Sequence, residues 1–430
     1  MKKFIFLILL CCSFLSIVRS QNLYLPPINN NLPWDSTSAS SLGWCTNRID
    51  SLYRFLELNN TKAFIVLKDG KIVLEKYFGS FTADSTWYWA SAGKSLTSLL
   101  IGKAQEEQYL SLQDTSAKYL GSGWTNATVA QENNIKVLHQ VTMTTGLNDG
   151  VPDNHCTLDT CLQYLAPAAT RWAYHNAPYT LLEKVIENAT GQNINTYTTA
   201  KIKSKIGMTG LWLTVDYDNV YYSKARSMAR FALLVQNNCI WNGDTVLRDP
   251  VYKQQMLNSS QNINPAYGYL WWLNGKGSFM LPSLQFSFPG SYAPDAPADM
   301  YAALGKNGQI ASIAPSKGLV VIRMGNPPGE SIEVPSQFCN TIWKNLNYVM
   351  CATATTTLYT FNGNGNWTDA ANWMNQQIPP AELQTGDQII INPPIFGECV
   401  LNTTQRIPPG CTLTIVAGKK FRIPGNLVVE

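Results

Sequence analysis

The sequence predicts an α+β fold that is followed by a small all-β module. Three observations support this prediction. Two β-rich runs flank Asp69-Gly70, which is a strong signal for a short hairpin. Residues 91–109 carry leucines at helical spacing, as in an amphipathic helix. After Tyr348 the composition changes to short β-rich runs broken by Gly and Pro, with few helical patterns.

The 430 residues allow two or three domains at roughly 100–200 residues each. We expect a Pro-, Asn- and Ser-rich N-terminal arm over 21–41, a main domain over 42–350, an Ala/Thr-rich linker over 351–357 and a β-rich module over 358–430. The elements expected in the main domain are, in order, a helix over 42–58, a hairpin over 63–78, a helix over 91–109, helical and loop sequence over 137–237, and a strand pair over 300–313 and 319–324. The β runs expected in the module, without a convincing internal repeat, are 388–391, 412–416 and 426–429.

Residues 1–20 have the features of a secretory signal peptide. Lys2 and Lys3 precede an apolar run over 4–18, and small residues stand at the two positions that cleavage before Gln21 requires. A membrane anchor is the alternative, but the apolar run is short for a spanning helix. We therefore expect a secreted protein, in the periplasm, on the cell surface or in the medium, without a transmembrane segment.

The composition excludes several classes of protein. An apolar content of 45% with 11% aromatic residues argues against disorder. The formal charge of +4 falls to about +1 once the signal peptide takes away Lys2, Lys3 and Arg19. No basic face then remains to hold a phosphate backbone, so we expect no nucleic-acid partner.

Eight cysteines remain after residue 20, an even number that suggests disulfides in an oxidising compartment. Many pairings are open, but short spacings favour Cys156–Cys161 and Cys399–Cys411 as local loops. No CxxC pair or His cluster indicates a metal site.

The strongest candidate for chemistry begins with Ser91-x-x-Lys94. Positions three apart share a helix face, so the Lys94 amine can serve as a base beside the Ser91 hydroxyl. At a helix start, Ser91 also has free N–H groups that favour a developing anion. The aromatic run 87–89 can desolvate Lys94 and lower its pKa. This motif alone recurs by chance and is weak.

Tyr174-His175-Asn176 is the second motif. A phenol held between two ammonium groups can have a lowered pKa and relay protons. Asn176 can bind a substrate carbonyl and orient the lysine. His175 is expected to be an exposed spacer rather than a catalytic base.

Lys306-Asn307-Gly308-Gln309, on the predicted strand over 300–313, is the third motif. The Lys306 cation can hold a substrate carboxylate or depress the pKa of the tyrosine. Gly308 allows close approach of the backbone. The backbone N–H groups of Gln309 and of the serine can form an oxyanion hole.

Together, in this order, the three motifs resemble those of the class C β-lactamase-like serine hydrolases. This family includes β-lactamases, D-Ala-D-Ala peptidases, esterases and 6-aminohexanoate-dimer hydrolases. The stretches 135–146, 174–191 and 303–309 also look like family sequence, and the match covers about residues 42–348. The resemblance implies a mostly antiparallel sheet flanked by helices, with a helical subdomain.

The resemblance also implies a role for each matched residue. Ser91 attacks the acyl carbon, and Lys94 takes its proton. Tyr174 is the base in acylation or deacylation and the acid for the leaving group. Asn176 orients the lysine and the substrate, and Lys306 supports the tyrosine and a substrate anion. No cofactor and no metal are needed.

The third motif departs from the family pattern, because Asn307 stands where β-lactamases usually have Thr. This argues against β-lactam turnover. The surrounding G-x-x-G-Q pattern looks more like the esterase and amide-hydrolase branch, with Asn307 and Gly308 lining the substrate site. Tyr267 and Trp271 either wall the substrate pocket or belong to the core. Trp367 and Trp373 either stack on sugar rings or are core residues.

The sequence thus predicts a secreted serine hydrolase that cleaves amide or ester bonds of small substrates through an acyl-serine intermediate. One alternative is a D-Ala-D-Ala peptidase or penicillin-binding protein that acts on cell-wall peptides. Another is a peptide- or glycan-binding protein of the same fold without turnover. Contact of the C-terminal module with a polysaccharide or a cell surface is a further hypothesis.

Overall fold

The computed structural model describes residues 23–329, 333–351, 357–383, 386–408 and 410–429. The predicted signal peptide lies outside these ranges, as does most of the predicted linker. The chain divides into two units, one ending at Val349 and the other beginning at Met350. Within the described residues, no helix is both apolar and long enough to cross a bilayer.

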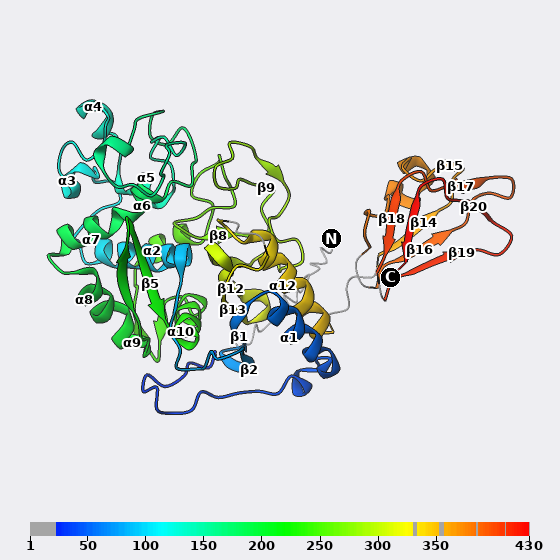
Figure 1. Cartoon of the computed structure of the whole chain (residues 1–430), viewed down its shortest axis with the longest axis horizontal. Coiled ribbons are helices and arrows are strands. Elements are labelled where there is room, and N and C mark those ends of the chain that lie inside the picture. The colour runs from blue at the N-terminus through cyan, green and yellow to red at the C-terminus, as the bar shows by residue number, and fades with distance from the viewer. Residues whose placement is uncertain (1–22, 330–332, 352–356, 384–385, 409, 430) are drawn as a thin grey trace, which may run out of the picture. The chain divides into compact units, whose positions relative to one another are not determined.

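A six-stranded sheet forms the centre of the first unit (Figure 1). Its strands are, in spatial order, β2 (Lys71–Tyr77), β1 (Thr61–Lys68), β13 (Leu319–Gly325), β12 (Gln309–Ala314), β11 (Tyr301–Gly305) and β8 (Trp272–Leu273). All neighbours pair antiparallel. The predicted α+β class is confirmed.

The hairpin predicted at Asp69-Gly70 joins β1 to β2. Both turn residues have positive φ, +48° and +84°. A side chain at Gly70 would meet the carbonyl oxygen of Tyr24 at 1.8 Å, because the N-terminal arm crosses the turn here. Glycine is therefore required at this position for both conformation and space.

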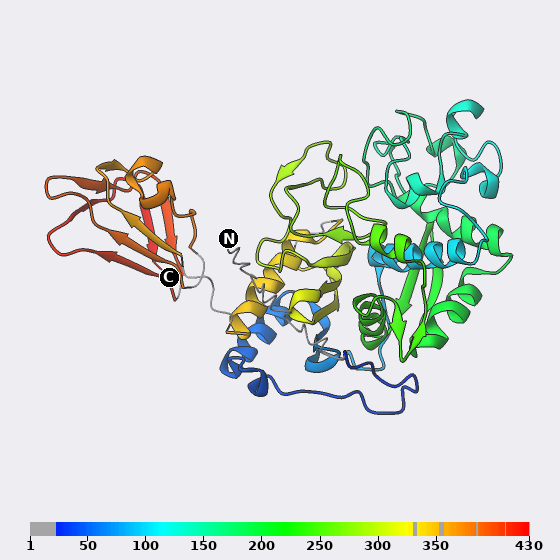
Figure 2. The same cartoon turned by 180° about the vertical axis from the view of Figure 1, so that it is seen from behind.

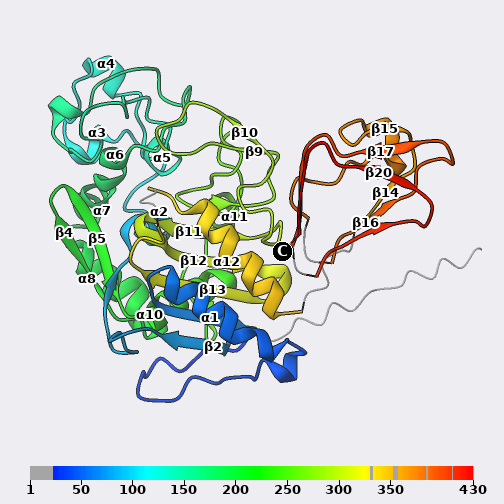
Figure 3. The ribbon, with the colours of Figure 1, turned by 45° about the vertical axis from the view of Figure 1, so that its right-hand side comes forward.

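Helices cover both faces of the sheet (Figure 2 and Figure 3). The helices α1 (Ile49–Leu58) and α12 (Ser336–Val349) pack together on one face. On the other face lie α10 (Ala225–Gln236) and α2 (Gly93–Glu106). Both α2 and α10 are buried over most of their length, including polar side chains such as Lys94 and Arg230.

A helical subdomain follows α2 in the chain. Its helices are α3 (Ala117–Leu120), α4 (Val129–Glu132), α5 (Val137–Val141), α6 (Asn176–Thr180), α7 (Leu182–Thr190), α8 (Ile194–Thr198) and α9 (Ser204–Ile206), with a π-helical turn over Thr199–Lys203. A separate apolar cluster around Trp124, Ile135 and Leu162 forms part of its core. The stretch predicted as helices and loops also contains the strand pair β4 (Leu211–Val215) and β5 (Asp218–Ser223).

The remaining elements of this unit are short. They are β3 (Trp87–Tyr88), which pairs with β5, β6 (Ile240–Trp241), β7 (Asp244–Thr245), α11 (Pro250–Met256), β9 (Ser278–Phe279) and β10 (Phe288–Pro289).

The single strand predicted over 300–313 is wrong. The structure divides it into β11 and β12, which form a hairpin around a turn at Lys306–Gly308. Asn307 and Gly308 both have positive φ, +64° and +79°. These two residue types tolerate the left-handed conformation, so the turn interrupts a run that is otherwise apolar and extended.

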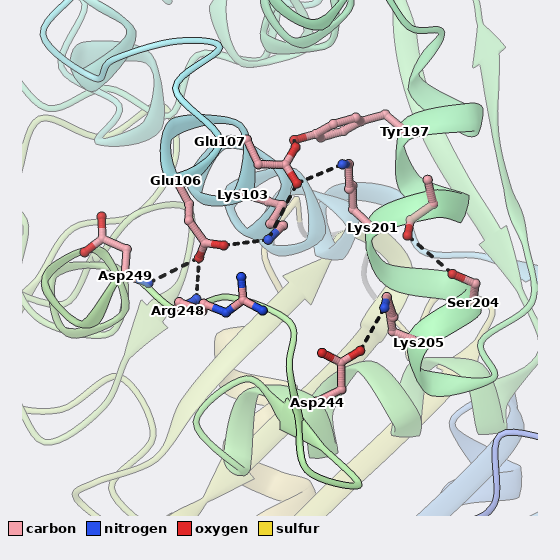
Figure 4. Close-up of polar contacts among 11 residues, drawn as sticks. Lys103, Glu106, Glu107, Tyr197, Lys201, Ser204, Lys205, Asp244, Arg248 and Asp249 are labelled. Atoms are coloured by element: carbon pink, nitrogen blue, oxygen red, sulfur yellow. Dashed lines mark hydrogen bonds and ion pairs between the residues drawn. The ribbon is translucent and has the colours of Figure 1, made fainter.

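A network of ion pairs fixes the C-terminal end of α2 (Figure 4). Lys103 contacts Glu106 at 2.6 Å and Glu107 at 3.6 Å. Glu107 also accepts hydrogen bonds from Lys201 at 2.8 Å and from the Tyr197 hydroxyl at 3.2 Å. Glu107 therefore joins the end of α2 to α8 and to the turn over Thr199–Lys203. This contact anchors the helix that starts beside Ser91.

We expect Glu107→Gln to lower the free energy of unfolding by about 2 kcal/mol, because two ammonium groups lose a partly buried carboxylate. Urea denaturation measures this change. The matched control is Glu57→Gln on α1, an exposed residue for which a change below about 0.5 kcal/mol is expected. Equal effects of the two substitutions would contradict an anchoring role for Glu107.

The second unit consists of parallel strands stacked in three columns. These are β14 (Leu358–Phe361), β16 (Gln388–Ile391) and β19 (Thr412–Ile415), then β15 (Gly365–Asn366), β17 (Glu398–Val400) and β20 (Lys420–Arg422), and finally β18 (Thr404–Ile407) and β21 (Asn426–Val429). Ile389 pairs with Leu413 and Gln405 with Leu427, so these later coils repeat after 24 and 22 residues, whereas Leu358 pairs with Gln388 after 30 residues. The backbone of the module therefore repeats, although its sequence carries no convincing repeat.

Trp367 and Trp373 belong to the apolar core of this unit and are 1% and 2% exposed. Their rings pack edge to face at 4.7 Å, so neither indole offers a surface for sugar stacking. The structure therefore supports the interpretation of both tryptophans as core residues and not as sugar-stacking residues.

One of the two favoured disulfides is present. Cys156 and Cys161 are joined, and Cys45 and Cys351 are also disulfide-bonded. The predicted Cys399–Cys411 bridge is wrong, because Cys399 is a buried thiol. It lies on β17 and faces the core, whereas Cys411 precedes β19 in a different column.

Candidate active site

Ser91 lies in the turn that leads into α2, between β3 and the helix. A short 3-10 turn over Ala90–Ala92 carries it, and α2 begins at Gly93. Ala90 has a φ of +47°, which is unfavourable for alanine and marks local strain next to the serine. Trp89 holds the turn, because it is fully buried and its indole N–H donates to the Ser223 hydroxyl at 2.8 Å.

Lys94 lies one turn further on, with its amine beside the serine. Lys94 Nζ is 3.2 Å from Ser91 Oγ and 2.8 Å from Asn176 Oδ1. The aromatic ring of Tyr179 lies 3.8 Å from the nitrogen. The predicted Ser-x-x-Lys geometry is thus present in the structure, and it extends to the asparagine of the second motif.

Burial decides the protonation of Lys94. Complete desolvation lowers the pKa of Lys94 to about 8, although the carboxylates of Asp218 and Glu333 act in the opposite direction. A substantial fraction of this amine is therefore neutral near pH 8. A neutral amine at hydrogen-bond distance can accept the proton of the Ser91 hydroxyl.

Tyr174 lies behind the lysine, and its environment differs from the expected one. Burial raises the pKa of Tyr174 above its usual value, and the nearby hydroxyl of Ser91 offsets only part of this rise. Lys94 approaches the ring at 5.1 Å, but no cation–ring contact of Lys306 with this tyrosine is found among the described residues. The expectation of a phenol with a lowered pKa between two ammonium groups is therefore wrong, and the phenol keeps its proton at neutral pH.

Asn176 is the first residue of α6 and is 1% exposed. Its Oδ1 accepts from Lys94, and its Nδ2 faces Asn154, His155 and Glu333. His155 is held in turn by Asp218, whose carboxylate lies 2.8 Å from His155 Nδ1. These contacts join the loop with Asn154 and His155, strand β5 and the segment at Glu333 to the helix that carries the asparagine.

The turn with Lys306 and Asn307 forms the opposite wall. Lys306 is exposed, and Asn307 Nδ2 donates to the Tyr88 hydroxyl at 2.8 Å. The guanidinium of Arg323 holds the turn from behind, because Nη1 donates to the carbonyl oxygens of Asn307 at 2.7 Å and of Gly308 at 3.1 Å. A side chain at Gly308 would meet this guanidinium at 2.5 Å, which explains the glycine.

Strand β11 crowds the backbone next to Ser91. A side chain at Gly305 would meet the carbonyl oxygen of Trp89 at 2.3 Å and the Ser91 nitrogen at 3.1 Å. Gly305 pairs with Gln309 across the β11–β12 hairpin. The two predicted oxyanion donors, the N–H groups of Ser91 and Gln309, therefore lie on segments that Gly305 allows to approach each other.

A cavity of about 500 Å³ opens over these groups. The residues lining it include Ser91, Lys94, Asn176, Lys306, Asn307, Tyr88, Asn154, His155, Tyr179, Asp218 and Glu333. The first five were predicted from the sequence. Of the others, Tyr88 lies on β3 and belongs to the aromatic run 87–89, and Tyr179 follows Asn176 by less than one helical turn on α6. Asp218 lies on β5, and Asn154, His155 and Glu333 lie in loops; no local motif marks these four residues.

Two residues predicted to bind substrate do not reach this cavity. Tyr267 and Trp271 are 1% and 0% exposed. Trp271 stacks on Phe231 at 5.8 Å, and Tyr267 packs edge to face against Tyr174 at 6.3 Å. A substrate-binding role for these two side chains is wrong, because the run that carries them turns its aromatic rings into the core.

His175 is not the exposed spacer that the sequence suggested. It is 2% exposed, and burial lowers its pKa to about 4. Neither ring nitrogen has a hydrogen-bond partner among the described residues. His175 is therefore a neutral core residue at physiological pH. Its surroundings give no support for a role as a metal ligand or as a catalytic base.

The comparisons with known proteins agree with the fold of the first unit. A structure assigned as a 6-aminohexanoate-dimer hydrolase from Bacillus anthracis aligns with a TM-score of 0.56 at 20% identity, over 74% of this chain and 89% of that one. A β-lactamase-like structure from Bacteroides dorei aligns with a TM-score of 0.56 at 17% identity, over 71% of this chain and 98% of that one. A penicillin-binding protein homologue from Caulobacter crescentus aligns with a TM-score of 0.50 at 14% identity, over 66% of this chain and 93% of that one.

These alignments place the first unit in the class of β-lactamase-like and penicillin-binding-protein-like folds. A family profile described as Beta-lactamase matches residues 61–333. The chain belongs to the Beta-lactamase family, as its three motifs predicted. A search of curated proteins found no match.

Proposed function

We propose that the chain is a secreted serine hydrolase that cleaves amide or ester bonds of small substrates through an acyl-serine intermediate. The observation that carries this proposal is the hydrogen-bonded series Ser91–Lys94–Asn176 at the floor of the cavity. Its family membership supports a hydrolase. The signal-like sequence over 1–20 and the disulfide at Cys156 support secretion.

In the first step, neutral Lys94 takes the hydroxyl proton of Ser91, whose oxygen attacks the acyl carbon of the substrate. The N–H groups of Ser91 and Gln309 hold the oxyanion that forms. The bond to the leaving group then breaks. The leaving alcohol or amine receives the proton from Lys94, with the protonated hydroxyl of Tyr174 as the relay.

In the second step, a water molecule attacks the acyl-serine ester and gives its proton to the same amine. The tetrahedral intermediate collapses, Ser91 recovers its proton, and the acid product leaves. The Tyr179 ring, 3.8 Å from Lys94 Nζ, favours the ammonium form that exists between these transfers.

Substitution of the nucleophile tests this proposal. We expect Ser91→Ala to abolish both adduct formation with a fluorophosphonate and hydrolysis of an activated aryl ester. The melting temperature should change by less than about 2 °C, because the hydrogen bond between the hydroxyl and Lys94 is long, at 3.2 Å. Intact-mass spectrometry and differential scanning calorimetry give the two readouts. Ser204→Ala, an exposed serine outside the cavity, is the matched control and should keep the adduct.

The same experiment separates the alternatives. A long-lived penicillin adduct on Ser91 would favour the D-Ala-D-Ala peptidase reading, with cell-wall peptides as substrates. A folded wild-type protein that reacts with no probe would reject the hydrolase and favour a binding protein. Asn307 already donates to Tyr88, so we expect little gain from a lactam carboxylate at this turn.

A further inference from the structure

We propose that this site selects acyl groups that carry no amide next to the scissile carbonyl, because the protein itself occupies the amide group of Asn176. The preferred substrates are then esters or amides of simple aliphatic or aromatic acids, rather than of N-acylated amino acids such as peptides and penicillins. This inference rests on the proposed function and concerns the same pocket.

The orientation of the Asn176 side chain is fixed by Lys94. The lysine nitrogen lies 2.8 Å from Oδ1. As an ammonium it can only donate hydrogen bonds, and as a neutral amine it donates through two N–H groups while its lone pair serves the Ser91 hydroxyl. The oxygen of the amide must therefore face the lysine. The NH2 group consequently points to the other side, toward the loops.

On that side, the NH2 group meets three acceptors. Glu333 Oε1 lies at 2.8 Å, Asn154 Oδ1 at 3.1 Å and His155 Nε2 at 3.2 Å. The group has two hydrogen atoms to donate, so three acceptors exceed its capacity. No N–H of this amide remains for a substrate carbonyl.

Asp218 makes His155 an acceptor. Its carboxylate lies 2.8 Å from His155 Nδ1, which places the ring proton on that nitrogen. The other nitrogen, Nε2, then presents a lone pair to Asn176. Asp218 and His155 therefore act as positioning residues for the asparagine.

The amide carbonyl oxygen of an acylamino substrate would weaken its binding in this pocket. To reach Asn176 Nδ2 it would have to displace the charge-assisted hydrogen bond that this NH2 group donates to Glu333. Its oxygen would also approach the carboxylate itself, which repels it. A hydrocarbon chain of the same length makes no such demand, so the pocket discriminates against the amide.

Two aryl esters of equal chain length test this inference, one of pentanoic acid and one of N-acetylglycine. Each kcat/KM is divided by the rate of alkaline hydrolysis of the same ester, to remove differences in intrinsic reactivity. We expect the wild-type enzyme to favour the pentanoate by about tenfold or more. In the double variant His155→Ala/Glu333→Ala, one N–H becomes free and the ratio should fall by about tenfold.

The matched control is His155→Gln/Glu333→Gln, which offers an acceptor oxygen at both positions and should keep the wild-type ratio. A wild-type enzyme that favours the N-acetylglycyl ester overturns the inference, and this comparison needs no variant. A folded alanine variant with an unchanged ratio also overturns it. Absence of Ser91-dependent hydrolysis of either ester rejects the proposed function instead.

Discussion

Replacing Lys94 with methionine is expected to slow the acylation of Ser91 by about 10³-fold. In the wild-type protein, acylation should rise with pH along a limb centred near pH 8, because only the neutral amine accepts the serine proton and the pKa of Lys94 is lowered to about 8. The methionine variant should lack this limb. Stopped-flow measurement of acylation by an activated ester gives both effects. The pH should range from about 6 to about 10, roughly two units on either side of the lysine pKa.

Two variants sharpen this result. Lys184→Met on α7 removes an exposed ammonium far from the cavity and should leave the limb unchanged. Tyr174→Phe should also keep the limb, because the pKa of Tyr174 is raised and its phenol does not titrate in this range. A limb near pH 8 that persists without Lys94, or that vanishes without Tyr174, would show that another group is the base.

Replacing Arg323 with methionine is expected to lower the free energy of unfolding by about 3 kcal/mol or more. This guanidinium is fully buried and donates to Thr61 Oγ1 and to the carbonyl oxygens of Asn59, Asn307, Gly308 and Asn326. Methionine fills the space but leaves these buried oxygens without a donor. Urea denaturation followed by fluorescence measures the loss.

The same substitution should slow acylation at temperatures where the protein stays folded, because the turn with Lys306 loses its support. Arg323→Lys keeps a charge but not the planar set of donors. The stability of this variant should therefore lie between those of the wild-type protein and the methionine variant. Arg54→Met on α1 is the matched control, an exposed arginine whose loss should cost less than about 0.5 kcal/mol. Wild-type stability and acylation in the methionine variant would refute a supporting role for Arg323.

The local sequence correctly predicted those elements that depend only on residues close to one another in the chain. The hairpin at Asp69-Gly70 needs only a turn with positive φ between two β-rich runs, and it is present. The Ser91 and Lys94 contact needs only one helical turn. The β runs of the second unit also appear as strands β16, β19 and β21.

Sequence patterns failed where distant segments decide the outcome. The turn at Asn307 is held by Arg323 from another strand, and nothing in the local run reports this. His155, Asp218 and Glu333 reach the cavity from three separate segments, so no spacing relates them. The substrate-binding prediction for Trp271 failed for a similar reason. An aromatic residue gives the same sequence signal whether it lines a pocket or lies in the core.

The parallel columns of the second unit make its folding nearly one-dimensional. Each coil, of 22 to 34 residues, rests on its neighbours along the stack and contributes its own strands to the shared core. The stability of such an array is approximately a sum of coil terms and interface terms. Gain or loss of one coil in a gene would therefore change the length of the stack by one strand spacing, about 4.8 Å. Such a module can vary in size while the residues around Ser91 stay unchanged.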